Sequence, residues 1–231
     1  MRITDLTVLP EKRSECLHRE GTELLVTAVE PLDKNRSKVF LDQEFAFVLY
    51  KGELRLFRIA VGSVLPEEDY CKIMSEILPL RAKKRAMNLL MKREYTEYKL
   101  REKLREGAYP ERIIEEALEY VRSFRYIDDE RYAADFISDH ADARSRRRME
   151  QDLSARGISG EVIQRAYEKW QESGGEQDEI AMMRKLLEKR RFDPDTASRE
   201  ERARTAQFLI RKGFPWEKVR RVLDFGGCEE C

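Results

Sequence analysis

The sequence predicts a mostly α-helical protein of tandem three-helix repeats, preceded by a small antiparallel β unit at the N-terminus. Three observations predict this fold class. Before about residue 65, β-branched and aromatic residues gather in short runs between polar breaks, as in strands. After it, apolar residues recur at three and four positions, as on one face of a helix. In that second part, a leucine followed four residues later by a small residue occurs three times in one repeated pattern.

The first 65 residues favour strands. Segments 23–29 and 38–50 are rich in β-branched and aromatic residues, and the second is interrupted by the polar residues 42–44, which predict a hairpin turn. Residues 54–59 alternate apolar and charged side chains between two glycines, as a further strand would. We therefore predict an antiparallel β unit over residues 1–65.

The helical part begins at Pro66, which we place at the first helical position because three acids follow it and favour the positive end of the helix dipole. Later prolines are expected at connections between helices: Pro79, Pro110, Pro194 and Pro215. Residues 171–178 contain paired glycines among polar side chains, and they predict a linker between two helical units. Ser198 and Glu201 form a capping-box pattern that predicts another helix start.

The repeat is defined by a leucine that is followed four residues later by a small residue. The three pairs are Leu104 with Ala108, Leu153 with Gly157, and Leu209 with Gly213. This spacing predicts a helix that ends at a left-handed glycine cap, followed by a new helix. In the first copy Gly107 precedes the alanine, so we expect that cap to be displaced by one residue. With one helix upstream of each copy, the predicted division is residues 1–65, 66–124, 125–172 and 173–231, the last including a C-terminal tail.

The most distinctive segment runs from Tyr126 to Ala133 and reads YIDDERYA. Asp128 is a good helix N-cap, and the acids Asp129 and Glu130 suit the first turn, so a helix start explains much of the segment. Joined to the repeated unit, however, it resembles the RecX family of bacterial RecA regulators. The likeness covers about residues 80–223 and is most specific in the second copy.

This resemblance implies an elongated, curved array of three-helix repeats lying in the groove of the RecA filament on DNA. It implies a cytoplasmic regulator in DNA repair, homologous recombination and the SOS response. We expect a negative modulator of RecA that restrains ATPase, strand exchange and coprotease activity. The implied partners are the RecA filament and the single- or double-stranded DNA within it, and we expect a monomer that needs no cofactor.

Two other classes of protein stay open. Each copy of the repeat superficially resembles a helix-turn-helix, so the chain could instead be a helical protein that binds nucleic acid directly. A helical scaffold for unrelated proteins is the third possibility. A filament regulator should bind RecA-coated DNA far more tightly than bare DNA, whereas a direct binder should hold bare DNA with a steep salt dependence.

The charges balance overall, with 45 basic and 45 acidic residues, but not locally. Residues 184–221 hold 13 basic and 6 acidic residues, whereas residues 1–70 hold 10 and 13. Clustered cations suit phosphates, because neutralised phosphates release counterions, and arginine also forks onto carboxylates. The alternative is a solvated helix face. The predicted partner- and DNA-binding residues are Arg144, Arg146, Arg147, Arg148, Arg211, Lys212, Arg220 and Arg221.

Other groups favour structural roles. Five aromatic residues have the spacing of a helix core, which we prefer to base stacking: Tyr126, Tyr132, Phe136, Tyr167 and Trp170. Six glutamates of the first copy are interpreted as a solvated face: Glu102, Glu106, Glu111, Glu115, Glu116 and Glu119.

Several classes of protein are disfavoured. No apolar run approaches the ~18 residues of a membrane span, and the N-terminus has no apolar signal region, so we expect a cytosolic protein. Cys228 and Cys231 have metal-ligand spacing and could combine with Cys16 and His18, but we interpret the cysteines as free thiols and predict no metal site. No phosphate loop, dinucleotide fingerprint or nucleophile motif is present, so we predict no enzyme activity.

Overall fold

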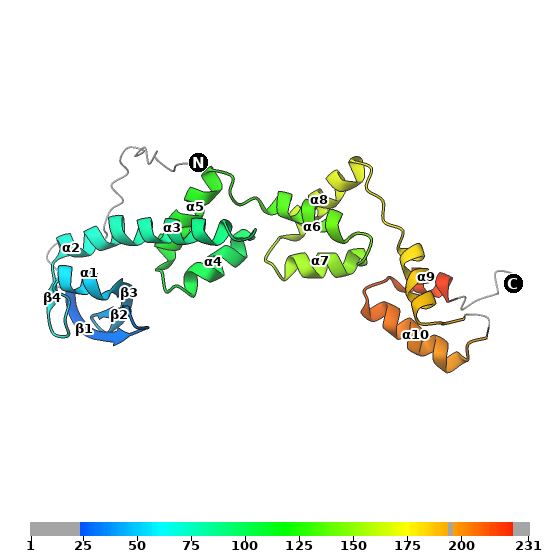
Figure 1. Ribbon diagram of the computed structural model, residues 1–231, viewed down its shortest axis with the longest axis horizontal. Coiled ribbons are helices and arrows are strands. Elements are labelled where there is room, and N and C mark those ends of the chain that lie inside the picture. The colour runs from blue at the N-terminus through cyan, green and yellow to red at the C-terminus, as the bar shows by residue number, and fades with distance from the viewer. Residues whose placement is uncertain (1–23, 194–195, 224–231) are drawn as a thin grey trace. The chain divides into compact units, whose positions relative to one another are not determined.

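The structure, a computed structural model, describes residues 24–193 and 196–223 (Figure 1). Helices predominate there, and a small antiparallel sheet comes first in the chain, so the predicted fold class is confirmed. The described residues form two compact units: 24–88 with Lys103–Val121, and Leu89–Glu102 with 122–193 and 196–223.

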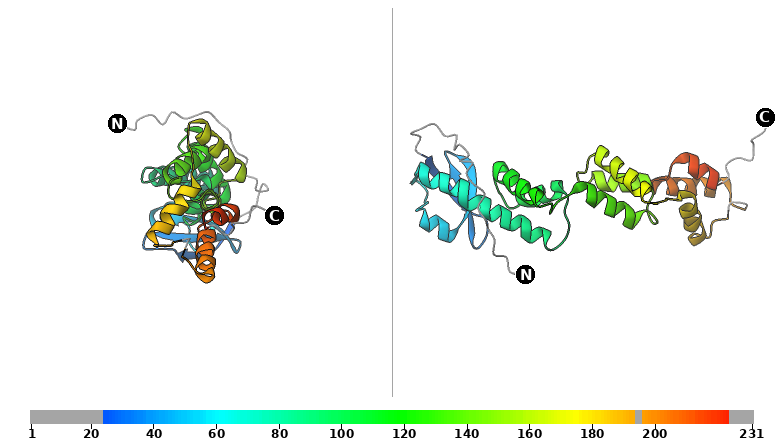
Figure 2. Two further views of the ribbon diagram at one scale, coloured as in Figure 1. Left: turned by 90° about the vertical axis from the view of Figure 1, so that its right-hand side faces the viewer. Right: turned by 90° about the horizontal axis from the view of Figure 1, so that it is seen from above.

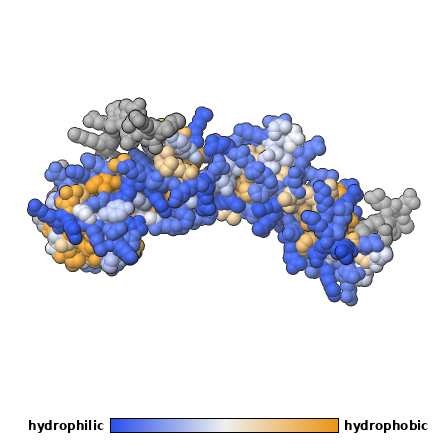
Figure 3. Space-filling view, viewed as in Figure 1, coloured by the Kyte–Doolittle hydropathy of each residue, from blue (hydrophilic) through white to orange (hydrophobic). Residues whose placement is uncertain are grey.

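The sheet has four antiparallel strands: β1 (Leu24–Pro31), β2 (Arg36–Leu41), β3 (Glu44–Tyr50) and β4 (Val64–Leu65). Their spatial order is β3-β2-β1-β4. One face is apolar because alternate side chains point to the same side, and Val26, Val39 and Phe47 are fully buried. Other apolar side chains of this region are exposed, and Figure 3 shows them as orange atoms over the strands.

The hairpin between β2 and β3 turns at Asp42 and Gln43, whose φ angles are +49° and +73°. Two successive left-handed residues form a type I′ turn, whose twist matches that of the strands. The Thr27 hydroxyl accepts a hydrogen bond from the backbone N–H of Gln43 at 2.9 Å, which helps to hold this conformation without a glycine. The predicted hairpin is confirmed.

The strand predicted over residues 54–59 is wrong, because the chain forms helix α1 (Lys51–Leu56) there. The Glu53 carboxylate accepts a hydrogen bond from the Tyr50 N–H at 2.8 Å and pairs with Arg81, so it fixes the first turn of the helix. Leu56 is 71% exposed, so the alternating apolar residues do not share a buried face. The cap and the tertiary ion pair thus favoured a helix over the strand that the alternation of apolar and charged residues predicts.

Three helical segments form one continuous helix, which can be followed in Figures 1 and 2: α2 (Glu67–Lys72), the π-helical η1 (Ile73–Ile77) and α3 (Leu78–Leu90). Pro66 is the N-cap rather than the first helical residue. Pro79 lies within this helix, so its predicted place at a connection is wrong. A proline removes one N–H and crowds the preceding turn, and the wider π turns come directly before it.

The remaining helices are α4 (Glu97–Arg105), α5 (Glu111–Ser123), α6 (Asp129–His140), α7 (Arg146–Ser154), α8 (Gly160–Glu172), α9 (Glu179–Lys189), α10 (Arg199–Arg211) and α11 (Trp216–Val222). The starts of α6 and α10 follow the predicted signals. Asp128 caps α6 by accepting from two backbone N–H groups, and Ser198 and Glu201 form the predicted capping box of α10. The predicted linker corresponds to the end of α8 and the connection to α9.

The C-terminal caps follow the repeat. Gly157 and Gly213 have φ angles of +84° and +91°, as predicted. In the first copy Ala108 itself is left-handed, with φ +57°, so the expected displacement of the cap is wrong. The position in the repeat, rather than the residue type, determined where the helix turns.

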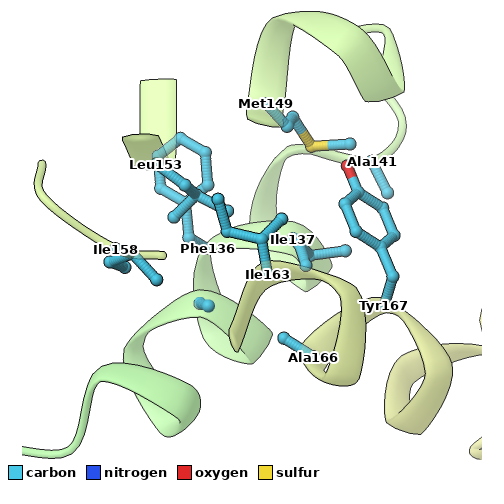
Figure 4. Close-up of a cluster of buried hydrophobic side chains, with 10 residues drawn as sticks. Phe136, Ile137, Ala141, Met149, Leu153, Ile158, Ile163, Ala166 and Tyr167 are labelled. Carbon is cyan, nitrogen blue, oxygen red and sulfur yellow. The ribbon is translucent and has the colours of Figure 1, made fainter. Parts of the chain in front are cut away.

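The second three-helix group has its own core, drawn in Figure 4, in which Phe136 from α6, Leu153 from α7 and Tyr167 from α8 come together. A separate cluster from α9, α10 and α11 forms the third core. Tyr132 and Trp170 pack against the second core, as the core interpretation predicts. Tyr126 does not fit that interpretation: it is 47% exposed, and its ring stacks on Phe124 with centroids 5.8 Å apart.

Four of the glutamates interpreted as a solvated face form ion pairs with nearby cations: Lys99 with Glu102, Lys103 with Glu106, Arg105 with Glu111, and Lys83 with Glu116. Exposed pairs of this kind stabilise a helix only slightly. The acidic face is therefore largely neutralised by the chain itself.

Candidate basic groove

The groove forms where the second and third three-helix groups are joined. The Ser145 hydroxyl caps α7 and donates a hydrogen bond to the Lys212 carbonyl at 2.8 Å. A Cβ atom at Gly213 would overlap this hydroxyl, so only glycine allows the close approach. The buried carboxylate of Glu179 accepts from the Arg146 N–H at 3.0 Å. The end of α10 and the start of α9 are thereby held against the start of α7.

The same arrangement occurs one repeat earlier. The Thr96 hydroxyl, at the start of α4, donates to the Arg156 carbonyl at 2.7 Å. A Cβ at Gly157 would again overlap a neighbouring side chain. The Asp129 carboxylate accepts from the Glu97 N–H at 2.9 Å. Residues at equivalent positions of the repeat thus form equivalent junctions. Asp129, in the YIDDERYA segment, therefore has a structural role.

A cavity of about 610 Å³ opens at the later junction. Basic residues dominate its lining: Arg144, Arg148, Arg156, Arg211 and Lys212. Asp152 is the acidic residue of the lining, and the apolar residues include Leu186, Phe208 and Phe214. We call this cavity the basic groove.

Asp152 organises part of the positive charge. Its carboxylate pairs with Arg144 at 2.7 Å and with Arg148 at 3.2 Å, and its carbonyl accepts from the Arg156 guanidinium at 2.6 Å. Arg211 and Lys212 form no ion pair within residues 24–193 and 196–223. With five cations and one carboxylate, the groove attracts anions.

Aromatic rings lie under several of these cations. The Arg156 guanidinium lies 4.8 Å from the Phe136 ring centroid, and Lys212 lies 5.7 Å from that of Phe208. Arg190, outside the lining, stacks on Phe208 at 4.0 Å. Cation–π contacts hold charged groups over an apolar surface and limit their motion. The basic groove is therefore a cationic surface whose charged groups are partly ordered.

The structure brings four of the predicted binding residues into the groove: Arg144, Arg148, Arg211 and Lys212. Arg146 has contacts elsewhere, since it pairs with Glu150 at 2.8 Å and its guanidinium lies over the Tyr167 ring. The other three are exposed on α7 and α11 and do not line the groove: Arg147, Arg220 and Arg221.

Sequence reasoning missed Arg156. It follows Leu153 by three residues, as Lys212 follows Leu209, so the repeat alignment itself could have found it. In the described part of the chain, no three His, Cys, Asp or Glu side chains are placed to hold a metal. The cysteines and His18 considered for zinc lie outside the described residues. No helix of the described ranges is long and apolar enough to span a membrane.

Tandem three-helix groups, joined by repeated caps and carrying a basic groove, define a helical-repeat binding protein. Comparison with known proteins identifies the family. Models of the first, second and third three-helix domains of RecX match residues 82–120, 128–166 and 176–223, which together are more than half of the chain. The chain belongs to the RecX family, as the sequence resemblance indicated.

Curated relatives carry the name regulatory protein RecX. The protein of Clostridium acetobutylicum is 28% identical over 195 residues, which cover 82% of this chain and 89% of the relative. That of Chromobacterium violaceum is 33% identical over 148 residues, which cover 64% and 91%. The family is therefore a regulatory one.

Solved structures agree with the fold. A crystal structure of a regulatory protein RecX, 25% identical, has a TM-score of 0.57 and covers 87% of this chain and 99% of its own. RecX from Lactobacillus salivarius, 19% identical, has a TM-score of 0.51, covers 64% and 96%, and supports the fold alone.

Proposed function

We propose that this protein is a negative modulator of the RecA recombinase. It binds in the groove of the RecA–DNA filament and restrains ATPase, strand exchange and coprotease activity. It acts as a cytoplasmic monomer in DNA repair, homologous recombination and the SOS response, without a cofactor. The observation that carries this proposal is the basic groove, set between two repeats of a regulatory family.

The physical argument begins with the charges. A filament of protein on DNA presents phosphates and carboxylates, and the groove offers five cations for one carboxylate. Arginine can bind either anion through two parallel hydrogen bonds. A protein that binds one arrangement of the filament more tightly than another shifts the filament toward that arrangement. Such a shift would slow every activity that requires the filament to rearrange.

The test is RecA ATPase activity on single-stranded DNA, measured as this protein is titrated in. We compare Arg211→Gln/Lys212→Gln, which removes two groove cations, with Arg220→Gln/Arg221→Gln, which removes two exposed cations outside it. The groove variant should need about tenfold more protein for half-maximal inhibition, because two charge contacts with the filament are lost. The control pair on α11, which the sequence also predicts to bind the partner, should shift inhibition less than the groove pair does, because its two cations lie outside the groove.

Equal inhibition by both variants and the parent would contradict the assignment of the groove. Weakening by the control pair alone would move the interface to α11, where sequence reasoning also placed binding residues. Both variants change exposed side chains, so their melting temperatures should match that of the parent.

The second candidate function is direct binding of nucleic acid. It is favoured by the same excess of cations, which would attract bare DNA as well. The slope of the logarithm of affinity against the logarithm of salt concentration separates the two. For a direct binder, the slope falls by about one unit for each phosphate-contacting cation removed. Its affinity for DNA should change little when RecA coats the DNA.

A further inference from the structure

The positive surface does not end at the basic groove. Arg156 lines the groove with its side chain, while its carbonyl accepts the hydrogen bond from Thr96. The start of α4 is therefore attached at this edge of the groove. Lys99 lies on the first turn of α4, three residues after Thr96. Its ammonium donates a hydrogen bond to the Glu102 carboxylate at 2.8 Å, which raises the pKa of Lys99.

Tyr98 precedes Lys99 in α4, and this aromatic residue is 42% exposed. Its first atoms lie directly over Gly157, where no Cβ would fit. The Lys99 ammonium is 5.1 Å from the centre of the ring. Tyr98 thus packs over the glycine at this junction and remains partly open to solvent beside the Lys99 ammonium. Packing over Gly157 accounts for the position of Tyr98, and its 42% exposure leaves it able to contact a partner.

We propose that a single strand of nucleic acid crosses both junctions, with its phosphates on the groove cations and Lys99 and a base stacked on Tyr98. This inference rests on the proposed function and deepens it, because it names nucleic acid as the part of the filament that this surface touches. Non-specific single-strand sites combine a cationic path with exposed rings, since every base has a face that can stack. An acidic protein segment would use the cations but would gain less from the ring.

The experiment uses the full chain and oligothymidylate carrying 5-iodouracil, at low ionic strength. Ultraviolet light should cross-link the oligonucleotide to Tyr98, and mass spectrometry of the peptides should locate the bond. Fluorescence anisotropy measures affinity in the same buffer. Tyr98→Leu keeps an apolar cover on Gly157 without an aromatic face and should weaken binding by about fivefold or more. Tyr98→Phe should retain parental affinity, because the ring still stacks.

Tyr126→Ala is the matched control, since Tyr126 has a similar exposure, 47%, and does not line the groove. It should bind as the parent does. Parental affinity of Tyr98→Leu, or cross-links that avoid Tyr98, would overturn the inference. If Tyr98→Leu binds RecA-coated DNA less tightly but bare strand normally, the surface contacts an acidic protein segment instead.

The two proposals fail separately. The proposed function fails if the groove variant Arg211→Gln/Lys212→Gln inhibits the RecA ATPase as the parent does, whatever the cross-links show. The inference about nucleic acid fails on cross-linking and bare-strand affinity alone. Thermal unfolding of Tyr98→Leu and Tyr98→Phe, measured alongside, identifies any loss of binding that follows from loss of folding.

Discussion

Ala108 and Gly157 occupy the same position in two copies of the repeat, and both backbones are left-handed, with φ +57° and +84°. In an L-residue this conformation brings the Cβ close to the following carbonyl, whereas glycine adopts it freely. Ala108→Gly should therefore stabilise the protein by about 0.5–1 kcal/mol, after the greater chain entropy of glycine in the unfolded state is taken into account. Urea denaturation measures the change.

Arg125→Gly is the companion variant, because Arg125 is also left-handed, with φ +56°, just after α5. It should stabilise by a similar amount. If both variants are less stable than the parent, the free energy of backbone strain at these caps is smaller than the entropic cost of ordering the added glycine. Backbone conformation would then not determine the residue type at these positions.

Asp129 shows how burial and bonding oppose each other at one carboxylate. Burial raises its pKa above 3.8, although the bond from the Glu97 N–H acts in the opposite direction. A raised pKa means that ionisation costs more in the folded state, so the contribution of Asp129 to stability falls as pH rises through that pKa. Asp129→Asn keeps an acceptor without the charge.

The Asn variant should therefore gain stability over the parent as pH rises from below 3.8 to 7. Melting temperatures of both proteins across this range provide the measurement. Asp129→Ala is the control that removes the acceptor too, and it should be less stable than the Asn variant at every pH, because the Glu97 N–H loses its partner. A constant difference between parent and Asn variant would mean that burial does not govern this group.

At the scale of elements, the N-cap of α7 makes two contacts. The Ser145 hydroxyl accepts from the Arg148 N–H and donates to the Lys212 carbonyl, so it starts one helix and joins another. Ser145→Ala should cost about 2 kcal/mol, because the cap and a buried bond are both lost. Ser159 caps α8 alone and is exposed, so Ser159→Ala should cost only about 1 kcal/mol.

Chemical denaturation of the two serine variants tests this difference. Equal losses would mean that the bond to Lys212 contributes nothing beyond the cap. The comparison also measures how strongly neighbouring repeats support each other, since stability in a repeat protein depends on contacts between adjacent units.

At the scale of the whole molecule, we keep the division at residues 65, 124 and 172 as a proposal. The change of apolar period near residue 65 favours a separable β unit, but contacts cross that boundary. Arg81 of α3 donates to the Val48 carbonyl at 3.0 Å, pairs with Glu53, and lies 4.6 Å from the centre of the Tyr50 ring. The sheet and α3 therefore support each other within one compact unit.

Removal of residues 1–65 should consequently destabilise what remains of this unit, residues 66–88 and 103–121. Residues 122–193 and 196–223 should keep their protection. Hydrogen exchange followed by mass spectrometry can measure both regions in the same sample. Unchanged protection of α3 and α5 would show that the β unit separates freely and that the Arg81 contacts add little.

Local signals were enough to predict much of this fold. Asp128 and Ser198 predict helix starts because a side-chain cap acts within three residues. Gly157 and Gly213 predict helix ends because a left-handed cap is also a local feature of the backbone. The repeat made these signals stronger, because each copy confirms the others. Where a local signal was weak, as over residues 54–59, a tertiary ion pair decided the structure and the prediction was wrong.

Local sequence signals could not predict which cations line the basic groove. The sequence identified clusters of cations, but a run of arginines points in several directions around a helix, so Arg148 faces the groove while Arg146 packs over Tyr167. Only the tertiary junction brings Arg144 and Arg148 beside Lys212, because the Ser145 hydroxyl and Gly213 allow two distant helix ends to touch. Composition and spacing along the chain determine which residues are charged, whereas packing between repeats determines which charges act together.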